Sequence, residues 1–146
     1  MRNSAFLTAT VCLILTGCVA RTVSDVSFAS NTEFNITIAP NDHDQAFALT
    51  LTSNSLGPLC LDIDQWPNSL GQLHMGSERA QVTADGRTYP AADRNFGYCV
   101  GPRCSIRIVR GEQLHGHIAY SEFQGWPHGE GAAAAHLSFS VRPWHC

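Results

Sequence analysis

The sequence predicts an all-β fold, an antiparallel β-sandwich of about seven strands. Short runs that alternate apolar and polar residues recur along the chain, which is the period of a strand with one buried face. Clusters of Gly, Pro, Asn, Asp and Ser separate these runs and are typical of turns. After residue 20, no segment keeps the 3.6-residue period of an amphipathic helix.

The predicted strands follow one another with short turns between them. The first three are residues 34–38, 47–51 and 59–63, and in the third of these Leu59, Leu61 and Ile63 share one face. Asp85-Gly86 is a typical tight-turn pair and predicts a hairpin around it. The remaining strands, of which residues 114–123 form the longest run, are expected at residues 80–84, 87–89, 104–108, 114–123 and 136–141.

This number and spacing of strands resemble an immunoglobulin-like sandwich, with a small barrel as the alternative. The resemblance covers the architecture alone, because the Cys–Trp–Cys arrangement of antibody domains is not matched. An architecture of this kind implies no particular activity.

The beginning of the chain has the pattern of an export signal. Arg2 precedes an apolar run at residues 5–15, which leads to Leu15-Thr16-Gly17-Cys18. The run is shorter than the ~20 apolar residues that a membrane-spanning helix needs. The four residues resemble the lipobox of bacterial lipoproteins.

The resemblance implies that residues 1–17 are removed and that Cys18 becomes a lipidated N-terminus. The lipid would be a diacylglyceryl group on the sulfur and an acyl chain, such as palmitate, on the amine. Residues 18–31 then form the lipidated tether, and residues 32–146 form the β-sandwich domain. Because Val19 and not Asp follows the Cys, we expect anchorage at the outer membrane, facing the periplasm.

Charge excludes one class of partner. The formal net charge is −3, and all nine basic residues are Arg. This composition argues against a polybasic surface for nucleic acid or anionic lipid. We therefore expect no nucleic acid partner.

The cysteines predict two disulfides. Cys12 belongs to the signal and Cys18 to the lipid site, so four cysteines remain. An even number of cysteines in an exported chain indicates disulfides. Three pairings are possible, and we favour a short loop closed around Gly101 together with a bridge to the last residue. A metal or redox pair is the alternative for the short loop, although its spacing is not the usual two residues. The favoured pairs are Cys99–Cys104 and Cys60–Cys146.

A weak metal signal lies in the run 114–123. His115 and His117 are two apart and point to one face of a strand, so both imidazoles could meet one ion. The pair resembles part of the copper–zinc superoxide dismutase pattern, but the rest of that pattern is missing. Structural or surface His is the favoured interpretation, and we expect no cofactor. Residues that could supplement the pair are His74, Met75, His128, His136 and His145.

No catalytic pattern is present in the sequence. It lacks Gly-x-Ser-x-Gly, a phosphate-binding glycine loop and His-Glu-x-x-His. Asp62 and Asp64 share a strand face that we expect to be solvated. The sequence therefore predicts a protein without enzymatic activity.

Aromatic loops are the candidate binding surfaces. Trp66 and Trp126 each precede a Pro in an irregular stretch, where a stiff aromatic side chain loses little entropy on binding. The loop at residues 89–98 carries Asp93 and Arg94. The alternatives are that each Trp covers an open end of the sandwich, and that Asp93 and Arg94 satisfy loop backbone groups.

These observations predict a lipid-anchored binding protein of the bacterial cell envelope. Its partners would be the membrane, through the lipid, and an envelope protein. Inhibitors, immunity proteins and assembly factors are small lipoproteins of this general kind. The alternative is a periplasmic copper- or zinc-binding protein that uses His115 and His117.

Overall fold

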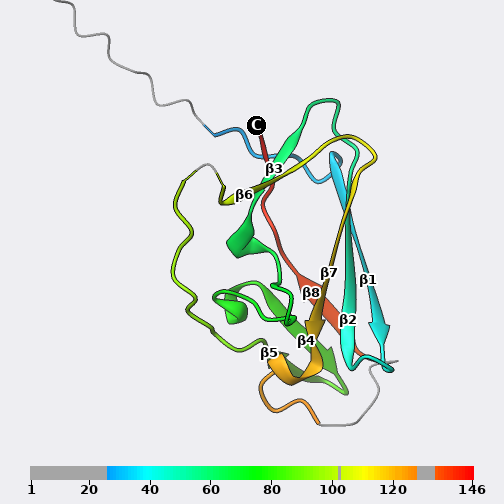
Figure 1. The fold of residues 1–146 in the computed structure, drawn as a ribbon. Coiled ribbons are helices and arrows are strands. Elements are labelled where there is room, and N and C mark those ends of the chain that lie inside the picture. The colour runs from blue at the N-terminus through cyan, green and yellow to red at the C-terminus, as the bar shows by residue number, and fades with distance from the viewer. Residues whose placement is uncertain (1–25, 102, 128–133) are drawn as a thin grey trace, which may run out of the picture.

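The fold was derived from a computed structural model, which describes residues 26–101, 103–127 and 134–146. These residues form nine strands and three short 3-10 helices (Figure 1). The lipobox, Cys18 and His128 lie outside the described residues, so the predictions for them are not addressed by the fold. Within the described ranges, no helix has the length and hydropathy that a membrane span requires.

The strands make three antiparallel sheets of three strands each, in agreement with the predicted all-β class. The first sheet has the order β1 (Phe34–Asn41), β2 (Ala46–Ser53), β7 (Gln113–Ala119). The second has the order β6 (Ser105–Ile108), β3 (Leu59–Asp62), β9 (Trp144–His145). The third has the order β5 (Arg87–Pro90), β4 (Ala80–Ala84), β8 (His136–Phe139). The described residues contain one strand more than the eight ranges predicted from the sequence, the two-residue β9, and the immunoglobulin-like arrangement stays a prediction.

Two predicted strands end early in helical turns. β7 ends at Ala119, and the next residues form η3 (Tyr120–Glu122). β3 ends at Asp62 and is followed by η1 (Ile63–Gln65). A 3-10 turn breaks the two-residue period, so Ile63 is exposed although alternation predicted it to be buried.

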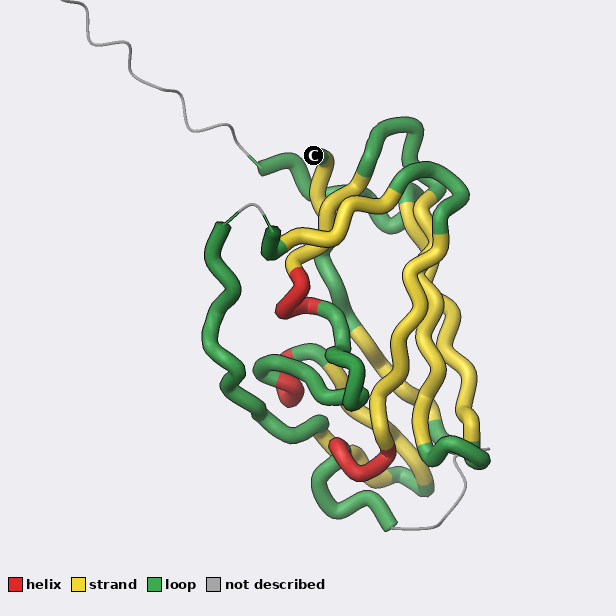
Figure 2. Tube along the Cα trace, viewed as in Figure 1, coloured by secondary structure: helices red, strands yellow, loops and turns green. Residues whose placement is uncertain are grey.

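The core lies between the β1–β2–β7 sheet and the remaining elements. Figure 2 shows these three strands on one side of the molecule and the loops and helical turns gathered on the other. Phe47 from β2 packs against Tyr120 and Phe123, with ring centroids 4.9 and 5.7 Å apart. Burying each such side chain stabilises the fold by about 1.5–3 kcal/mol. Other buried members of the core are Leu49, Leu51, Leu61, Leu73, Val82, Ile108, Ile118 and Leu137.

Both predicted disulfides are confirmed. Cys60 and Cys146 are bonded with their Cα atoms 5.5 Å apart, and Cys99 and Cys104 with theirs 5.4 Å apart. The first bridge spans 86 residues, and the entropy model gives about 4–5 kcal/mol of stabilisation for a loop of that length. It fixes β9 to β3.

The described part of the predicted tether makes backbone contacts near the end of the chain. Phe28 forms an antiparallel bridge with Trp144, and the Ala29 amide donates a 2.9 Å hydrogen bond to the Pro143 carbonyl. Residues 28 and 29 therefore pair with residues 143 and 144, at the start of β9.

Candidate functional site

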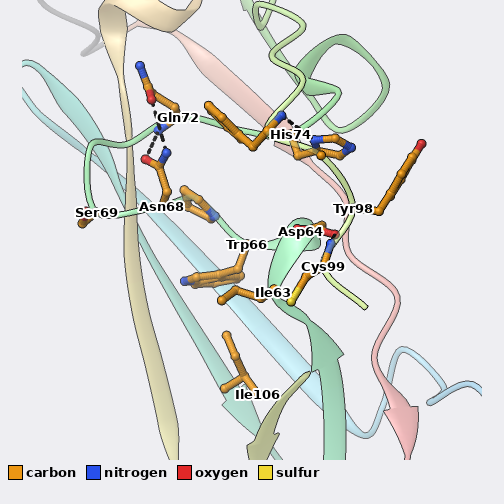
Figure 3. Close-up of a pocket in the computed structure, with 13 residues that line it drawn as sticks. Ile63, Asp64, Trp66, Asn68, Ser69, Gln72, His74, Tyr98, Cys99 and Ile106 are labelled. Carbon is orange, nitrogen blue, oxygen red and sulfur yellow. Dashed lines mark hydrogen bonds between the residues drawn. The ribbon is translucent and has the colours of Figure 1, made fainter. Parts of the chain in front are cut away.

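A cavity of about 620 Å³ opens beside η1 and the disulfide loop (Figure 3). One wall comes from the segment at residues 63–74 and the other from the loop at residues 96–99. The walls are mainly apolar and aromatic, as is usual for ligand-binding pockets. The residues that line it include Ile63, Asp64, Trp66, Asn68, Gln72, His74, Phe96 and Tyr98.

Trp66 is a fixed wall of the cavity. Its indole is 6% exposed, and Nε1 donates a 3.3 Å hydrogen bond to the His115 carbonyl. The indole lies against Gly116 so closely that a Cβ atom on this glycine would stand 2.6 Å from Nε1. Gly116 is thus required between the two His residues because an indole occupies the space over it. Trp66 is a buried side chain that borders a pocket, and it is not an exposed loop anchor.

Trp126, the other predicted loop anchor, is also buried. Its indole is 7% exposed and meets the Tyr89 ring edge to face, with centroids 5.2 Å apart. Tyr120 lies on another side, with its centroid at 6.2 Å. Trp126 is therefore buried against Tyr89 and Tyr120 and is not exposed in a loop.

The outer wall of the cavity presents two exposed rings. Phe96 is 52% exposed and Tyr98 is 76% exposed. The backbone between and after them is held in place: the Cys99 amide donates a 3.1 Å hydrogen bond to Asp64 Oδ2, and Cys99 is also joined to Cys104. Apolar rings are thus displayed on a restrained loop.

His74 supports this wall from inside. It is 4% exposed, and Nδ1 accepts a 3.3 Å hydrogen bond from the Phe96 amide, so the neutral ring carries its proton on Nε2. The imidazole packs edge to face against Tyr98, with centroids 5.0 Å apart (Figure 3). Nε2 is buried and has no hydrogen-bond partner among the described residues. His74 therefore ties the loop to the domain through one nitrogen only.

The amide side chains of the cavity hold their own loop. Asn68 Nδ2 donates a 3.2 Å hydrogen bond to Gln72 Oε1. Asn68 Oδ1 accepts from the amides of Leu70 and Gln72 at 2.9 and 3.0 Å. These hydrogen bonds of Asn68 and Gln72 stabilise the conformation of the cavity wall.

Asp93 and Arg94 anchor the start of the same loop. Arg94 donates two 2.9 Å hydrogen bonds to the buried Glu122 carboxylate, and these bonds raise the pKa of the Arg94 guanidinium. Asp93 accepts 2.9 Å hydrogen bonds from the Ser77 hydroxyl and amide, and they lower the pKa of its carboxyl. Both side chains are bonded within the protein, and Asp93 alone accepts from a backbone group, the Ser77 amide, whereas Arg94 bonds a carboxylate.

His115 and His117 are not among the residues that line the cavity. His115 Nδ1 is 3.1 Å from Thr50 Oγ1, and His117 borders a smaller hollow with Asn41 and Asp44. In the part of the chain that the structure describes, no group of three or more His, Cys, Asp or Glu side chains is placed to hold a metal ion.

The sequence did not single out His74, Phe96 or Tyr98 as members of one site. The two aromatic residues stand in the loop that was proposed for binding, which is a partial signal. The sequence indicates His74 only as a supplementary metal ligand. Its hydrogen bond to the Phe96 amide connects residues 22 positions apart, so no local pattern predicts this contact.

Comparison with known proteins gives no family: no family model, curated protein or solved structure matches the chain significantly.

Proposed function

We propose that the protein is a non-catalytic binding module that a lipid on Cys18 holds at the bacterial outer membrane, facing the periplasm. In this proposal the cavity between residues 63–74 and 96–99 receives an apolar side chain of an envelope protein. The observation that carries the proposal is the pair of exposed rings, Phe96 and Tyr98, on a loop that is restrained at both ends.

The restraint matters because binding energy is lost when a flexible loop must be ordered. Arg94–Glu122 holds one end of the loop and Cys99–Cys104 holds the other. Burying one Leu- or Phe-sized side chain contributes about 1.5–3 kcal/mol. Because the loop is already restrained, little of that free energy is lost to ordering it on binding.

The polar groups of the cavity support binding more than catalysis. Asp64 accepts the Cys99 amide, and the two amide side chains bond to each other. His74 is buried behind Tyr98, and Cys99, the cysteine among the described lining residues, has no free thiol because it is joined to Cys104. A nucleophile with an adjacent base, the usual requirement for covalent catalysis, is not assembled among the described lining residues.

Affinity capture from a detergent-solubilised envelope fraction tests the proposal. Wild-type protein and the Phe96→Ala/Tyr98→Ala variant are compared by quantitative mass spectrometry. The matched control is Leu70→Ala, since Leu70 is 68% exposed, apolar, and does not line the cavity.

We expect a protein that wild type and the control retain and that the double variant loses. Equal recovery by all three proteins, or recovery of no specific protein by wild type, would contradict a binding role for the cavity.

A further inference from the structure

The end of the domain where the tether enters is built from four adjacent chain segments. The Ser27 carbonyl accepts a 2.9 Å hydrogen bond from the His145 amide, which places the N-terminal segment beside β9. β9 pairs with β3, and β3 pairs with β6: Leu59 lies opposite both His145 and Ile108. When the pairing is extended by one residue along each segment, four residues lie side by side across the end of the sheet. They are Val26, Cys146, Pro58 and Val109.

Apolar side chains are exposed on and next to this row. Figure 1 shows the N-terminal segment, the turn between β2 and β3 and the turn between β6 and β7 together at this end of the molecule. Four of the nine large hydrophobic residues that are exposed in the described ranges belong to these segments. We call this surface the tether end; its exposed apolar members are Val26 (58%), Phe28 (49%), Leu56 (89%) and Val109 (44%).

The tether brings this surface to a bilayer before any other. A fully extended chain from Cys18 to Val26 reaches at most about 29 Å. A lipid on Cys18 therefore holds the tether end within that distance of the membrane, while the chain after β3 leads away from this end toward β4 (Figure 1).

The charges of the tether end are compatible with anionic headgroups. Arg110 is exposed and follows Val109, and the Arg142 guanidinium lies 4.3 Å from the centroid of the Phe28 ring. The acidic side chains here are bonded locally. Glu112 accepts the Val109 amide at 2.9 Å, and Glu33 accepts the Ser30 amide at 2.8 Å and lies 3.4 Å from His145 Nε2.

We propose that the tether end lies on the bilayer surface, with Leu56 and Val109 among the headgroups. The proposal rests on the lipid of the proposed function, which supplies most of the membrane affinity. The apolar side chains set the orientation of the domain, and the cavity then faces sideways and away from the membrane. A short tether alone would leave the domain free to rotate.

Photo-crosslinking into lipid tests this orientation. The full-length chain is produced through export, with p-benzoylphenylalanine replacing Leu56, Val109 or, as the matched control, Leu70. Each protein is reconstituted into phosphatidylethanolamine–phosphatidylglycerol vesicles and irradiated, and lipid adducts are quantified by mass spectrometry. The intact mass of the same sample reports the lipid on Cys18.

We expect several-fold more lipid adduct from positions 56 and 109 than from position 70, and a loss of the adducts at 109 in a Leu56→Glu background. Equal adducts at the three positions in a lipid-bearing sample would overturn the orientation alone. A sample without lipid on Cys18 would overturn both the orientation and the anchorage in the proposed function.

Discussion

Arg94 and Glu122 form a two-point hydrogen bond in which Nε and Nη2 of the guanidinium each lie 2.9 Å from a carboxylate oxygen. The Glu122 side chain is 4% exposed, whereas that of Arg94 is 42% exposed. Fork-shaped pairs of this kind fix geometry as well as charge. The Arg94–Glu122 pair joins the start of the cavity loop to η3, which directly follows β7.

Removal of the guanidinium should destabilise the fold, because it leaves the buried Glu122 carboxylate without its partner. We predict that Arg94→Ala lowers the melting temperature by roughly 5 °C or more, measured by differential scanning calorimetry. Arg87→Ala, at an exposed position of β5, is the control and should change it little. Glu122→Gln in the Arg94→Ala background should recover part of the loss, and no recovery would argue against a charge effect.

The glycine between the two His residues should not tolerate a side chain. Gly116→Ala places a methyl group against the Trp66 indole, and overpacking of this kind costs about 1–3 kcal/mol. Gly57→Ala is the matched control, since nothing lies within 4 Å of a Cβ atom at that position. Urea unfolding of both variants measures the difference, and equal stability would mean that the indole does not hold this place.

Tyr120 should make stability fall at alkaline pH. Burial, together with the hydrogen bond to Asp42, raises the pKa of Tyr120 from 10.0 to about 12. An acid whose pKa is raised on folding contributes stability that is complete below pH 10 and is lost as the pH approaches 12. The free energy of unfolding of wild type should therefore fall more steeply over this range than that of Tyr120→Phe. Parallel curves for the two proteins would contradict the shift.

The short disulfide should affect binding more than folding. Replacement of Cys99 and Cys104 by Ser frees one end of the cavity loop, and the loop must then be ordered on binding. We predict an affinity for the captured partner that is about three- to tenfold weaker, measured by isothermal titration calorimetry. The Cys60–Cys146 bridge is the contrast, because its removal should lower stability by about 4–5 kcal/mol. An unchanged affinity without the short bridge would show that the loop needs no such restraint.

Most of the strand pattern was predictable from local alternation. β2 and β4 bury alternate residues as expected, because their apolar side chains face one core. The disulfide pairs were also predictable, since chain ends and short Gly-Pro loops leave few sensible pairings. Turns that break the period were not predictable. Ile63 is exposed because it lies in a 3-10 helix directly after a strand.

The cavity depends on contacts between distant residues, and these leave little trace in the sequence. Trp66 was identified as an aromatic loop residue, but its burial follows from a glycine 50 positions later in the chain. Arg94 was identified as a binding candidate, yet its partner Glu122 is 28 positions away. The same residue types hold a loop in place and contact a ligand. Only the partner of each side chain in the folded structure distinguishes the two roles.

The most direct test of the proposed function is the affinity of Tyr98→Ala for the protein captured by wild type. Tyr98 is the most exposed ring of the cavity wall, so its removal deletes contact area without disturbing the core. Titration calorimetry should show an affinity at least about tenfold weaker than that of wild type, as expected for an aromatic contact at the centre of an interface. Leu70→Ala should bind as wild type does. Equal affinities for Tyr98→Ala and wild type would contradict the role assigned to the cavity.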